Sequence, residues 1–382
     1  AQDRPGRRRL HSYQSTGPPA LPASRQPRGS PRTPRLPSPS PAGGMASWGV
    51  MGTGRISQDF LGCLATNGSR VRALGARSAA RAAEVAAKFP GHIETAVDYD
   101  ALFADPQVSI VYVGTIHTEH AKGVKRALEA GKHCLVEKPI SMNGAEAMEL
   151  QKLAKDKNLF LMEGLWTRTF PLVDKLRDVL ASGLLGEIRG VKADLTIPIP
   201  GAVERNWDPA QGGGAMLDLG PYPLLWATFA FGAEEPQGFA ATAKLSPAGV
   251  DASGVLALTY QRGTASLHFA QQSSGPCAVE LLCDKGWARL EPINCPNRLE
   301  IHTGNPMHAN VKTEVHEDPW AHCDYPINYE GCQGLIHEAR HVEKCLADDL
   351  TESPLAPLDH SVQMRRLTDK FLADVGYGKT AA

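Results

Sequence analysis

The chain has 382 residues, of which 42 % are hydrophobic and 21 % are charged, and its formal net charge at pH 7 is -1. These values are ordinary for a globular protein, and they exclude a strongly basic nucleic-acid surface. No apolar run reaches the roughly 20 residues that span a bilayer, and no basic-then-apolar secretory signal opens the chain. We therefore expect a soluble, cytoplasmic protein without nucleic-acid or membrane partners.

Residues 1–44 differ from the rest of the chain. They contain eight Arg, a single acid and ten of the 29 prolines, with Ser and Gly between them. Such a segment buries too little apolar surface to offset the entropy of ordering, which predicts a disordered tail. Because Met45 directly precedes the first expected strand, the tail is either sequence outside the natural reading frame or an Arg-rich organelle transit peptide. The proline density disfavours the helix of a transit peptide.

Short apolar runs alternate with helical patterns from Ser47 to Glu163, beginning with SWGVMG and ending with LFLME. Strands separated by helices of this length require right-handed parallel crossovers. The pattern predicts an α/β protein with an N-terminal Rossmann domain over residues 45–165, a doubly wound parallel sheet covered on both faces.

The pattern changes after about Trp166. One further helix, PLVDKLRDVLASG, precedes strand-like stretches such as EIRGVKADLTI and GVLALTY, and an amphipathic helical pair ends the chain. Turn signals such as QRG and DKG favour antiparallel pairing between these strands. We expect an α+β domain over residues 166–382 with a large open, mostly antiparallel sheet.

A glycine-rich turn follows the first expected strand, with the sequence Gly52-Thr53-Gly54-Arg55-Ile56-Ser57. Gly52 permits a tight turn and Gly54 lets the backbone approach a pyrophosphate, while the helix that begins near Arg55 and Ile56 supplies N–H donors. The alternative is a turn that needs glycine only for its backbone angle. The strand-turn-helix context favours a dinucleotide-binding site.

The second expected strand ends in Arg77, followed by Ser78 and then by Arg81. An acid at this position would bind the ribose hydroxyls of NAD, whereas guanidinium and hydroxyl groups suit a 2′-phosphate. This pattern predicts NADP as the cofactor. The alternative for Arg81 is a solvated place on a helix face.

The motif Glu137-Lys138-Pro139 follows the expected strand HCLV at the carboxyl edge of the sheet, where doubly wound folds bind ligands. Here the sequence resembles the glucose-fructose oxidoreductase and inositol dehydrogenase family (Gfo/Idh/MocA), in which an EKP motif ends the Rossmann half. The resemblance covers Ser47 to Gly376. Within the family it is similar to dimeric trans-1,2-dihydrodiol dehydrogenases, also described as NADP-dependent D-xylose 1-dehydrogenases. The matching stretches are WGVMGTGRIS, ARSAAR, VGTIHTEH, EKP, LMEGLWTRTFP and QGGGAMLDLGPY.

The resemblance implies a cis peptide bond before Pro139 and a homodimer through the C-terminal sheet. It also implies roles for Lys138, Asp218 and Tyr222. A hydride leaving a carbinol requires an acceptor for the hydroxyl proton, and Tyr222 is the expected base. Lys138 would hydrogen-bond the reacting oxygen, and Asp218 would orient Lys138 or the substrate. We expect a helix N-terminus and the Lys138 ammonium to favour the phenolate of Tyr222. Many family members have His at the position of Tyr222, whereas the dihydrodiol dehydrogenase-like members have Tyr.

Other site residues are also implied by the resemblance. Gly114, His117 and Glu137 are expected beside the cofactor. Trp166 is expected to line the substrate pocket, with Arg168 close to it, because an aromatic wall suits a cyclic diol or a sugar. The alternatives are interdomain packing for Trp166 and a salt bridge for Arg168.

Metal chemistry is not expected. His117 and His120 are three residues apart, but no third ligand follows at a recognisable spacing. The eight cysteines include no CxxC pair, so we expect reduced thiols.

Two functions are compatible with these motifs. One is an NADP-dependent dehydrogenase that oxidises a cyclic trans-dihydrodiol or an aldopyranose such as D-xylose. The other is a catalytically weak NADP-sensing regulatory protein of the same fold. Because the EKP lysine and Tyr222 are both present, the sequence favours the enzyme.

Overall fold

The computed structural model describes residues 46–308 and 310–379, so the predicted tail of residues 1–44 lies outside the described residues. Six parallel strands form the first sheet, in the order β3-β2-β1-β4-β5-β6. Their bounds are β1 (Ser47–Met51), β2 (Arg70–Ala76), β3 (Ile93–Asp98), β4 (Ile110–Val113), β5 (His133–Glu137) and β6 (Leu161–Gly164). The expected doubly wound Rossmann sheet is confirmed, and its order reverses between β1 and β4, where such sheets bind ligands.

The central strands of this sheet are apolar on both faces. Every residue of β1 and β4 is buried, and alternate side chains enter two different cores, Val50 and Tyr112 in one and Met51 and Val113 in the other. The crossover helices that cover the faces are α1 (Arg55–Asn67), α2 (Ala79–Ala86), α3 (Tyr99–Ala104), α4 (His120–Glu129) and α5 (Gly144–Lys157).

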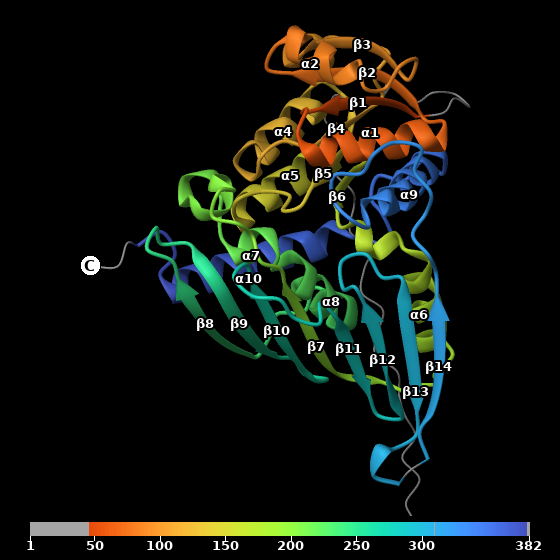
Figure 1. The fold of residues 1–382 in the computed structure, drawn as a ribbon, viewed down its shortest axis with the longest axis vertical. Coiled ribbons are helices and arrows are strands. Elements are labelled where there is room, and N and C mark those ends of the chain that lie inside the picture. Colours follow the sequence, from red (N-terminus) through yellow and green to blue (C-terminus); the bar gives the residue numbers. More distant parts are fainter. Residues whose placement is uncertain (1–45, 309, 380–382) are drawn as a thin grey trace, which may run out of the picture. The chain divides into compact units, whose positions relative to one another are not determined.

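Eight strands form the second sheet, in the order β14-β13-β12-β11-β7-β10-β9-β8 (Figure 1). All neighbours are antiparallel except β7 and β10, so the expected mostly antiparallel sheet is confirmed. Its strands are β7 (Ile188–Thr196), β8 (Gly238–Leu245), β9 (Asp251–Thr259), β10 (Thr264–Ala270), β11 (Val279–Cys283), β12 (Gly286–Glu291), β13 (Arg298–Thr303) and β14 (Lys312–Glu317).

One helix of the second half is apolar all round. This helix, α8 (Pro221–Phe231), packs on β7, β10 and β11 and is contacted by α10 (Leu358–Val375). Since it is covered on several sides, it needs no polar face. The remaining helices are α6 (Pro171–Ala181), α7 (Ala215–Asp218) and α9 (Leu335–Ala347).

The last two helices return to the Rossmann sheet. Helix α9 packs beside α1, as Figure 1 shows, and α10 packs on α5. The indole of Trp48 in β1 donates a hydrogen bond of 2.9 Å to Glu343 in α9. The end of the chain thus completes the cover of the N-terminal sheet.

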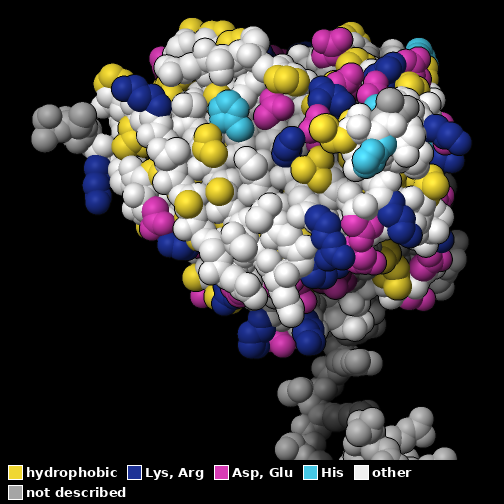
Figure 2. All heavy atoms as spheres, turned by 90° about the horizontal axis from the view of Figure 1, so that it is seen from below, with side chains coloured by type: hydrophobic (Ala, Val, Ile, Leu, Met, Phe, Trp, Pro, Cys, Tyr) yellow, Lys and Arg dark blue, Asp and Glu magenta, His cyan; other side chains and the backbone are white. Residues whose placement is uncertain are grey.

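Charged side chains of both signs are interspersed on the surface. On the face that Figure 2 shows, Lys and Arg lie beside Asp and Glu. Pairs such as Arg298 with Glu300, at 2.8 Å, follow the strands of the second sheet. Among residues 46–308 and 310–379, no helix is both long and apolar enough to cross a membrane.

Candidate active site

The turn between β1 and α1 requires glycine at its first position. Gly52 has φ 119°, and a Cβ there would lie 2.6 Å from the carbonyl oxygen of Gly114. The hydroxyl of Ser57 donates to that same carbonyl at 2.9 Å, which joins this turn to the one after β4. The backbone of Gly114 thus supports the turn from the neighbouring strand.

Gly54 has a different role from Gly52. Its φ is −69°, and a Cβ there would meet nothing closer than the Gly114 oxygen at 3.9 Å. The fold therefore leaves room at the N-terminus of α1, where Arg55 is exposed and Ile56 is half-buried. Open space beside unpaired helix N–H groups fits the pyrophosphate of a dinucleotide.

The end of β2 lies next to this turn, because Gly52 N–H donates to the carbonyl of Gly75 at 3.0 Å. Arg77 follows β2 and is exposed. Ser78 caps α2, and its hydroxyl accepts the N–H of Arg81 at 3.3 Å. The Arg81 guanidinium pairs with Glu84 at 2.5 Å. Of the two arginines, Arg77 is therefore the one better placed to meet a phosphate.

A largely buried ion pair occupies the carboxyl edge of the sheet. The Lys138 ammonium donates to the carboxylate of Asp218 at 2.9 Å and to its carbonyl oxygen at 2.7 Å. The EKP motif positions Lys138 directly after β5, and Asp218 is the last residue of α7. The peptide bond between Lys138 and Pro139 is cis, as the resemblance implied.

Asp218 carries the negative charge at the centre of the site. Burial alone would raise the pKa of its carboxyl group, but the charges of Lys138 and Arg205 hold that pKa well below its usual range. Burial lowers the pKa of His117 to about 3, so this imidazole is neutral. Its Nδ1 lies 3.1 Å from the carbonyl of Gly212, and its Nε2 lies 3.9 Å from Asp218 Oδ1. The carboxylate therefore stays charged, and Lys138 has a fixed partner.

Tyr222 stands beside this pair near the start of α8. Its hydroxyl accepts a hydrogen bond of 2.9 Å from the indole N–H of Trp166, and Lys138 Nζ lies 5.4 Å from its ring centre. Burial raises the pKa of the Tyr222 phenol well above 10, and the charge of Glu137 raises it further. The expected phenolate is therefore wrong for this structure, because Asp218 compensates the charge of Lys138 and burial opposes ionisation.

Two of the predicted site residues, Glu137 and Arg168, form hydrogen bonds with groups in the protein interior. The carboxyl group of Glu137 accepts a hydrogen bond from the Tyr112 hydroxyl at 2.8 Å, and burial raises its pKa. Arg168 is 2 % exposed. Its guanidinium donates to the carbonyls of Leu355 and Leu225 and to the hydroxyl of Thr228, and it also contacts a ring nitrogen of His360. These contacts favour an anchoring role for Arg168. Within residues 46–308 and 310–379 its guanidinium forms no ion pair, which was the alternative role expected from the sequence.

Two residues of the site were not expected from sequence. Asn206 donates to Asp218 Oδ2 at 2.6 Å, and Arg205 lies 3.8 Å from the same oxygen. Both come from a short 3-10 helix, Glu204–Trp207, in the irregular stretch between β7 and α7. No hydrophobic period marks that stretch, so its residues could not be placed from the sequence. The one available signal for Asn206 and Arg205 was that a buried carboxylate requires hydrogen-bond donors in addition to Lys138.

Residues 46–165 match the model of the oxidoreductase family with an NAD-binding Rossmann fold, and residues 173–289 match the GFO/IDH/MocA C-terminal domain. The chain is 34 % identical over 340 residues to trans-1,2-dihydrobenzene-1,2-diol dehydrogenase of Homo sapiens. It is 36 % identical to the enzyme of that name from Sus scrofa, and each match covers 86 % of this chain and 96 % of the relative. The chain belongs to the Gfo/Idh/MocA family of oxidoreductases.

Solved structures agree with this assignment. KijD10, a 3-ketoreductase from Actinomadura kijaniata in complex with NADP, is 26 % identical with a TM-score of 0.70, covering 87 % of this chain and 98 % of its own. A levoglucosan dehydrogenase in complex with NADH and levoglucosan has a TM-score of 0.75 at 18 % identity, with the same coverage, and supports the fold alone.

Proposed function

We propose that this oxidoreductase is an NADP-dependent dehydrogenase that oxidises a secondary or anomeric hydroxyl of a cyclic trans-dihydrodiol or a D-xylose-like aldopyranose. The observation that carries the proposal is the buried Lys138–Asp218 pair beside Tyr222, at the edge of the sheet where the dinucleotide turn also lies. Relatives covering 86 % of the chain are named trans-1,2-dihydrobenzene-1,2-diol dehydrogenases, which supports a cyclic diol.

NADP is the cofactor that the residues favour. Gly52 and Gly54 leave room for a pyrophosphate, and an exposed Arg77 stands where NAD-specific domains place an acid. The NADP complex of KijD10, at 26 % identity, supports the same choice. When bound, NADP supplies a nicotinamide that accepts a hydride.

Lys138 is the proposed hydrogen-bond donor to the reacting oxygen. An ammonium has three N–H donors, and Asp218 accepts two of those of Lys138. One donor thus remains for a substrate oxygen. Asp218 orients the ammonium, and Asn206 in turn holds the carboxylate in place.

Tyr222 is the proposed proton carrier. Because its oxygen accepts a hydrogen bond from Trp166, its own proton is free to be donated to a substrate oxygen. The neutral phenol can therefore act as the acid in the reductive direction. In the oxidative direction the phenolate must form first and then takes the hydroxyl proton as a base, so oxidation should be faster at alkaline pH.

The proposed substrate contacts follow from the same geometry. Trp166 borders Tyr222 through its indole, and the partly exposed Arg205 reaches the rim of the Asp218 site. An aromatic ring beside hydrogen-bonding groups suits a six-membered ring with adjacent hydroxyls. Arg168 is not among the proposed substrate contacts, because its guanidinium hydrogen-bonds the Leu355 carbonyl and the Thr228 hydroxyl.

A turnover assay tests the proposed function. NADPH formation would be followed with a trans-dihydrodiol, D-xylose and D-glucose, and NADPH binding would be measured by fluorescence. We expect Lys138→Met and Tyr222→Phe to lower kcat by about a hundredfold or more with NADPH still bound. The exposed Lys152, which pairs with Asp156 on α5, supplies the matched control Lys152→Met, which should keep full activity. Tight NADPH binding without turnover on these substrates would instead favour the NADP-sensing regulatory protein.

We also propose a homodimer through the second sheet, in the cytoplasm. Alternate residues of β9 and β10 are exposed on the face opposite α7 and α8, which leaves a broad surface for a second copy. The eight cysteines are unpaired, as in proteins of a reducing compartment. Light scattering on the purified chain tests the dimer, and a monomeric mass would overturn it.

A further inference from the structure

Residues 318–331, here called the α1 strap, connect β14 to the region of α9 and lie against helix α1. The strap is fixed to α1 by hydrogen bonds from three of its residues, and the backbone N–H of Asp324 donates to the Thr66 hydroxyl at 2.9 Å. Asn328 donates to Asp59 through its backbone N–H at 2.8 Å and its side chain at 2.6 Å, and Tyr329 N–H donates to the other oxygen at 3.1 Å. Asn328 also donates to the carbonyl of Arg55 at 3.2 Å. The strap therefore reaches the first turn of the helix that follows the dinucleotide turn.

Two cysteines meet where the strap crosses α1. Cys323 belongs to the strap and Cys63 to the helix, and the two thiol groups are close enough to shift each other's pKa. The Cys63 thiol also lies 3.4 Å from the carbonyl oxygen of Cys332 and 3.5 Å from that of Gln333. Thr66, one turn further along α1, donates to the Cys323 sulfur at 3.6 Å. A Cβ on Gly62 would lie 3.4 Å from this sulfur, which shows how closely the strap approaches the helix. The backbone N–H of Tyr325 is a further donor.

Hydrogen-bond donors beside the Cys323 sulfur favour its ionised form. The neighbouring Cys63 thiol is the largest contribution, and it lowers the pKa of Cys323 to about 6. The pKa of Cys63 is raised far above its ordinary value by the neighbouring Cys323 and by burial. Of the two thiols, Cys323 is therefore the one that ionises first.

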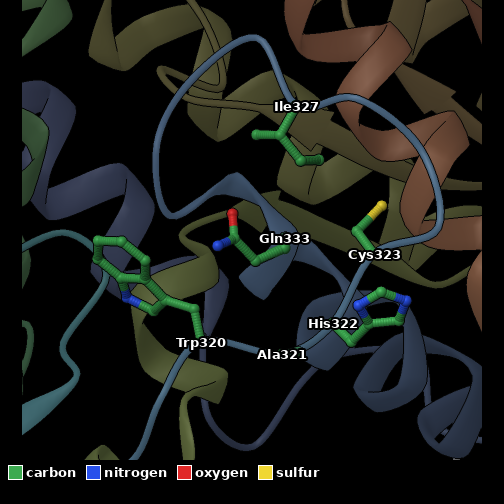
Figure 3. Close-up of a pocket in the computed structure, with 6 residues that line it drawn as sticks. All are labelled: Trp320, Ala321, His322, Cys323, Ile327 and Gln333. Atoms are coloured by element: carbon green, nitrogen blue, oxygen red, sulfur yellow. The ribbon is translucent and has the colours of Figure 1, made fainter.

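Cys323 can be reached from outside. It is half-buried and lines a pocket of about 400 Å³, together with Trp320, Ala321, His322, Ile327 and Gln333. Figure 3 shows the Cys323 side chain directed toward the orange helix, α1, from the chain segment that borders the pocket. Cys63, in contrast, is fully buried. A small oxidant thus meets the thiolate of Cys323 first, with a second thiol directly behind it.

We propose that Cys323 and Cys63 are a peroxide-sensitive thiol pair that is reversibly oxidised to a disulfide between the α1 strap and helix α1. The Cys323 thiolate attacks the outer oxygen of a hydroperoxide, so that an S–O bond forms, the O–O bond breaks and an alcohol or water leaves after protonation. The Cys63 sulfur then attacks the sulfenic acid. The S–S bond forms, and the departing hydroxide takes the Cys63 proton and leaves as water. A dithiol returns two electrons and two protons and restores both thiols.

Peptide mapping tests the pair. The reduced full-length chain would be treated with hydrogen peroxide, and its remaining thiols would be alkylated before digestion. We expect the loss of two thiols and a cross-linked peptide containing Cys63 and Cys323, both reversed by dithiothreitol. Cys63→Ser keeps a donor at this position and should stop at a sulfenic acid on Cys323, trapped by dimedone. Cys283→Ser is the control and should leave the cross-link unchanged.

Alkylation rates give an independent readout. Cys283 is also half-buried, but burial raises its pKa to about 11. At neutral pH we expect iodoacetamide to modify Cys323 at least about tenfold faster than Cys283, after allowing for the lower intrinsic nucleophilicity of the more acidic thiol. Thr66→Val, which removes one donor, should slow the Cys323 reaction. Equal rates for the two cysteines, no cross-link after peroxide, or a cross-link from Cys323 to Cys332 would each overturn the proposal.

Discussion

At the scale of single residues, Asp218 links the parts of the site. It accepts hydrogen bonds from Lys138 and Asn206, and its carboxyl pKa is held well below its usual range. An amide at this position would leave the largely buried Lys138 ammonium without a counter-charge. Removing one partner of a buried pair is costly because the other remains desolvated.

We predict that Asp218→Asn lowers the free energy of unfolding by about 3 kcal/mol at neutral pH. Since the folded pKa of Asp218 lies below the unfolded value of about 3.9, the unfolded chain binds more protons as the pH falls toward that value. The difference between wild type and variant should thus be complete above about pH 4 and shrink below it. Urea unfolding of both proteins across this range measures it. Asp374→Asn, which removes a surface pair with Lys370, should cost less than about 0.5 kcal/mol.

Arg77 and Arg81 differ in their surroundings, and cofactor selectivity should follow that difference. We predict that Arg77→Gln raises the KM for NADP by about tenfold or more and leaves the KM for NAD unchanged, because a charge-assisted hydrogen bond is lost only with the phosphate. Arg81→Gln should have the smaller effect, since Glu84 already pairs with this guanidinium. Steady-state kinetics with NADP and with NAD measures these KM values for both variants. If Arg77→Gln raised the KM for NADP and the KM for NAD by the same factor, Arg77 would not be the residue that binds the 2′-phosphate.

At the scale of elements, the turn from β1 to α1 separates a folding role from a binding role. We predict that Gly52→Ala destabilises the protein, because its Cβ would collide with the Gly114 carbonyl at a positive φ. Gly54→Ala should unfold like wild type, since its Cβ meets open space, but should weaken NADPH binding by blocking the pyrophosphate. Thermal unfolding and NADPH titration of both variants distinguish the roles. Unchanged NADPH affinity in Gly54→Ala would contradict the binding role proposed for Gly54.

Regular elements were largely predictable from the sequence, whereas the details of the site were not. The buried strands and GxGxxS turn marked the Rossmann sheet because their periods and glycines are local signals. Asn206 and Arg205 were missed because an irregular loop carries no period. The neutral phenol of Tyr222 was missed because its pKa depends on burial and on the compensation of Lys138 by Asp218, both set by tertiary contacts.

At the scale of the whole molecule, the two sheets share helices. Helices α9 and α10 follow the second sheet in sequence, yet they pack on α1 and α5 of the first. Arg340 and Glu343 of α9 hydrogen-bond Asn67 at the end of α1, at 2.7 and 3.2 Å. Residues of both halves also form one continuous apolar core.

We therefore predict cooperative unfolding of the two halves. In hydrogen exchange at low denaturant, peptides from β4 and from α10 should lose protection with the same opening free energy, because each depends on the shared core. Mass spectrometry of the exchanged peptides measures this. Separate opening of the β4 peptide, with α10 still protected, would show that the Rossmann half is stable without its C-terminal cover.

The most direct test of the proposed dehydrogenase is the transfer of the carbinol hydrogen itself. A trans-dihydrodiol or D-xylose labelled with deuterium at the reacting carbon would be incubated with NADP and wild-type enzyme, and the NADPH formed would be analysed by mass spectrometry and NMR. The account predicts one deuterium on the nicotinamide ring, with transfer slowed by the label and abolished in Lys138→Met. NADPH formed without deuterium, or undiminished transfer in Lys138→Met, would contradict it.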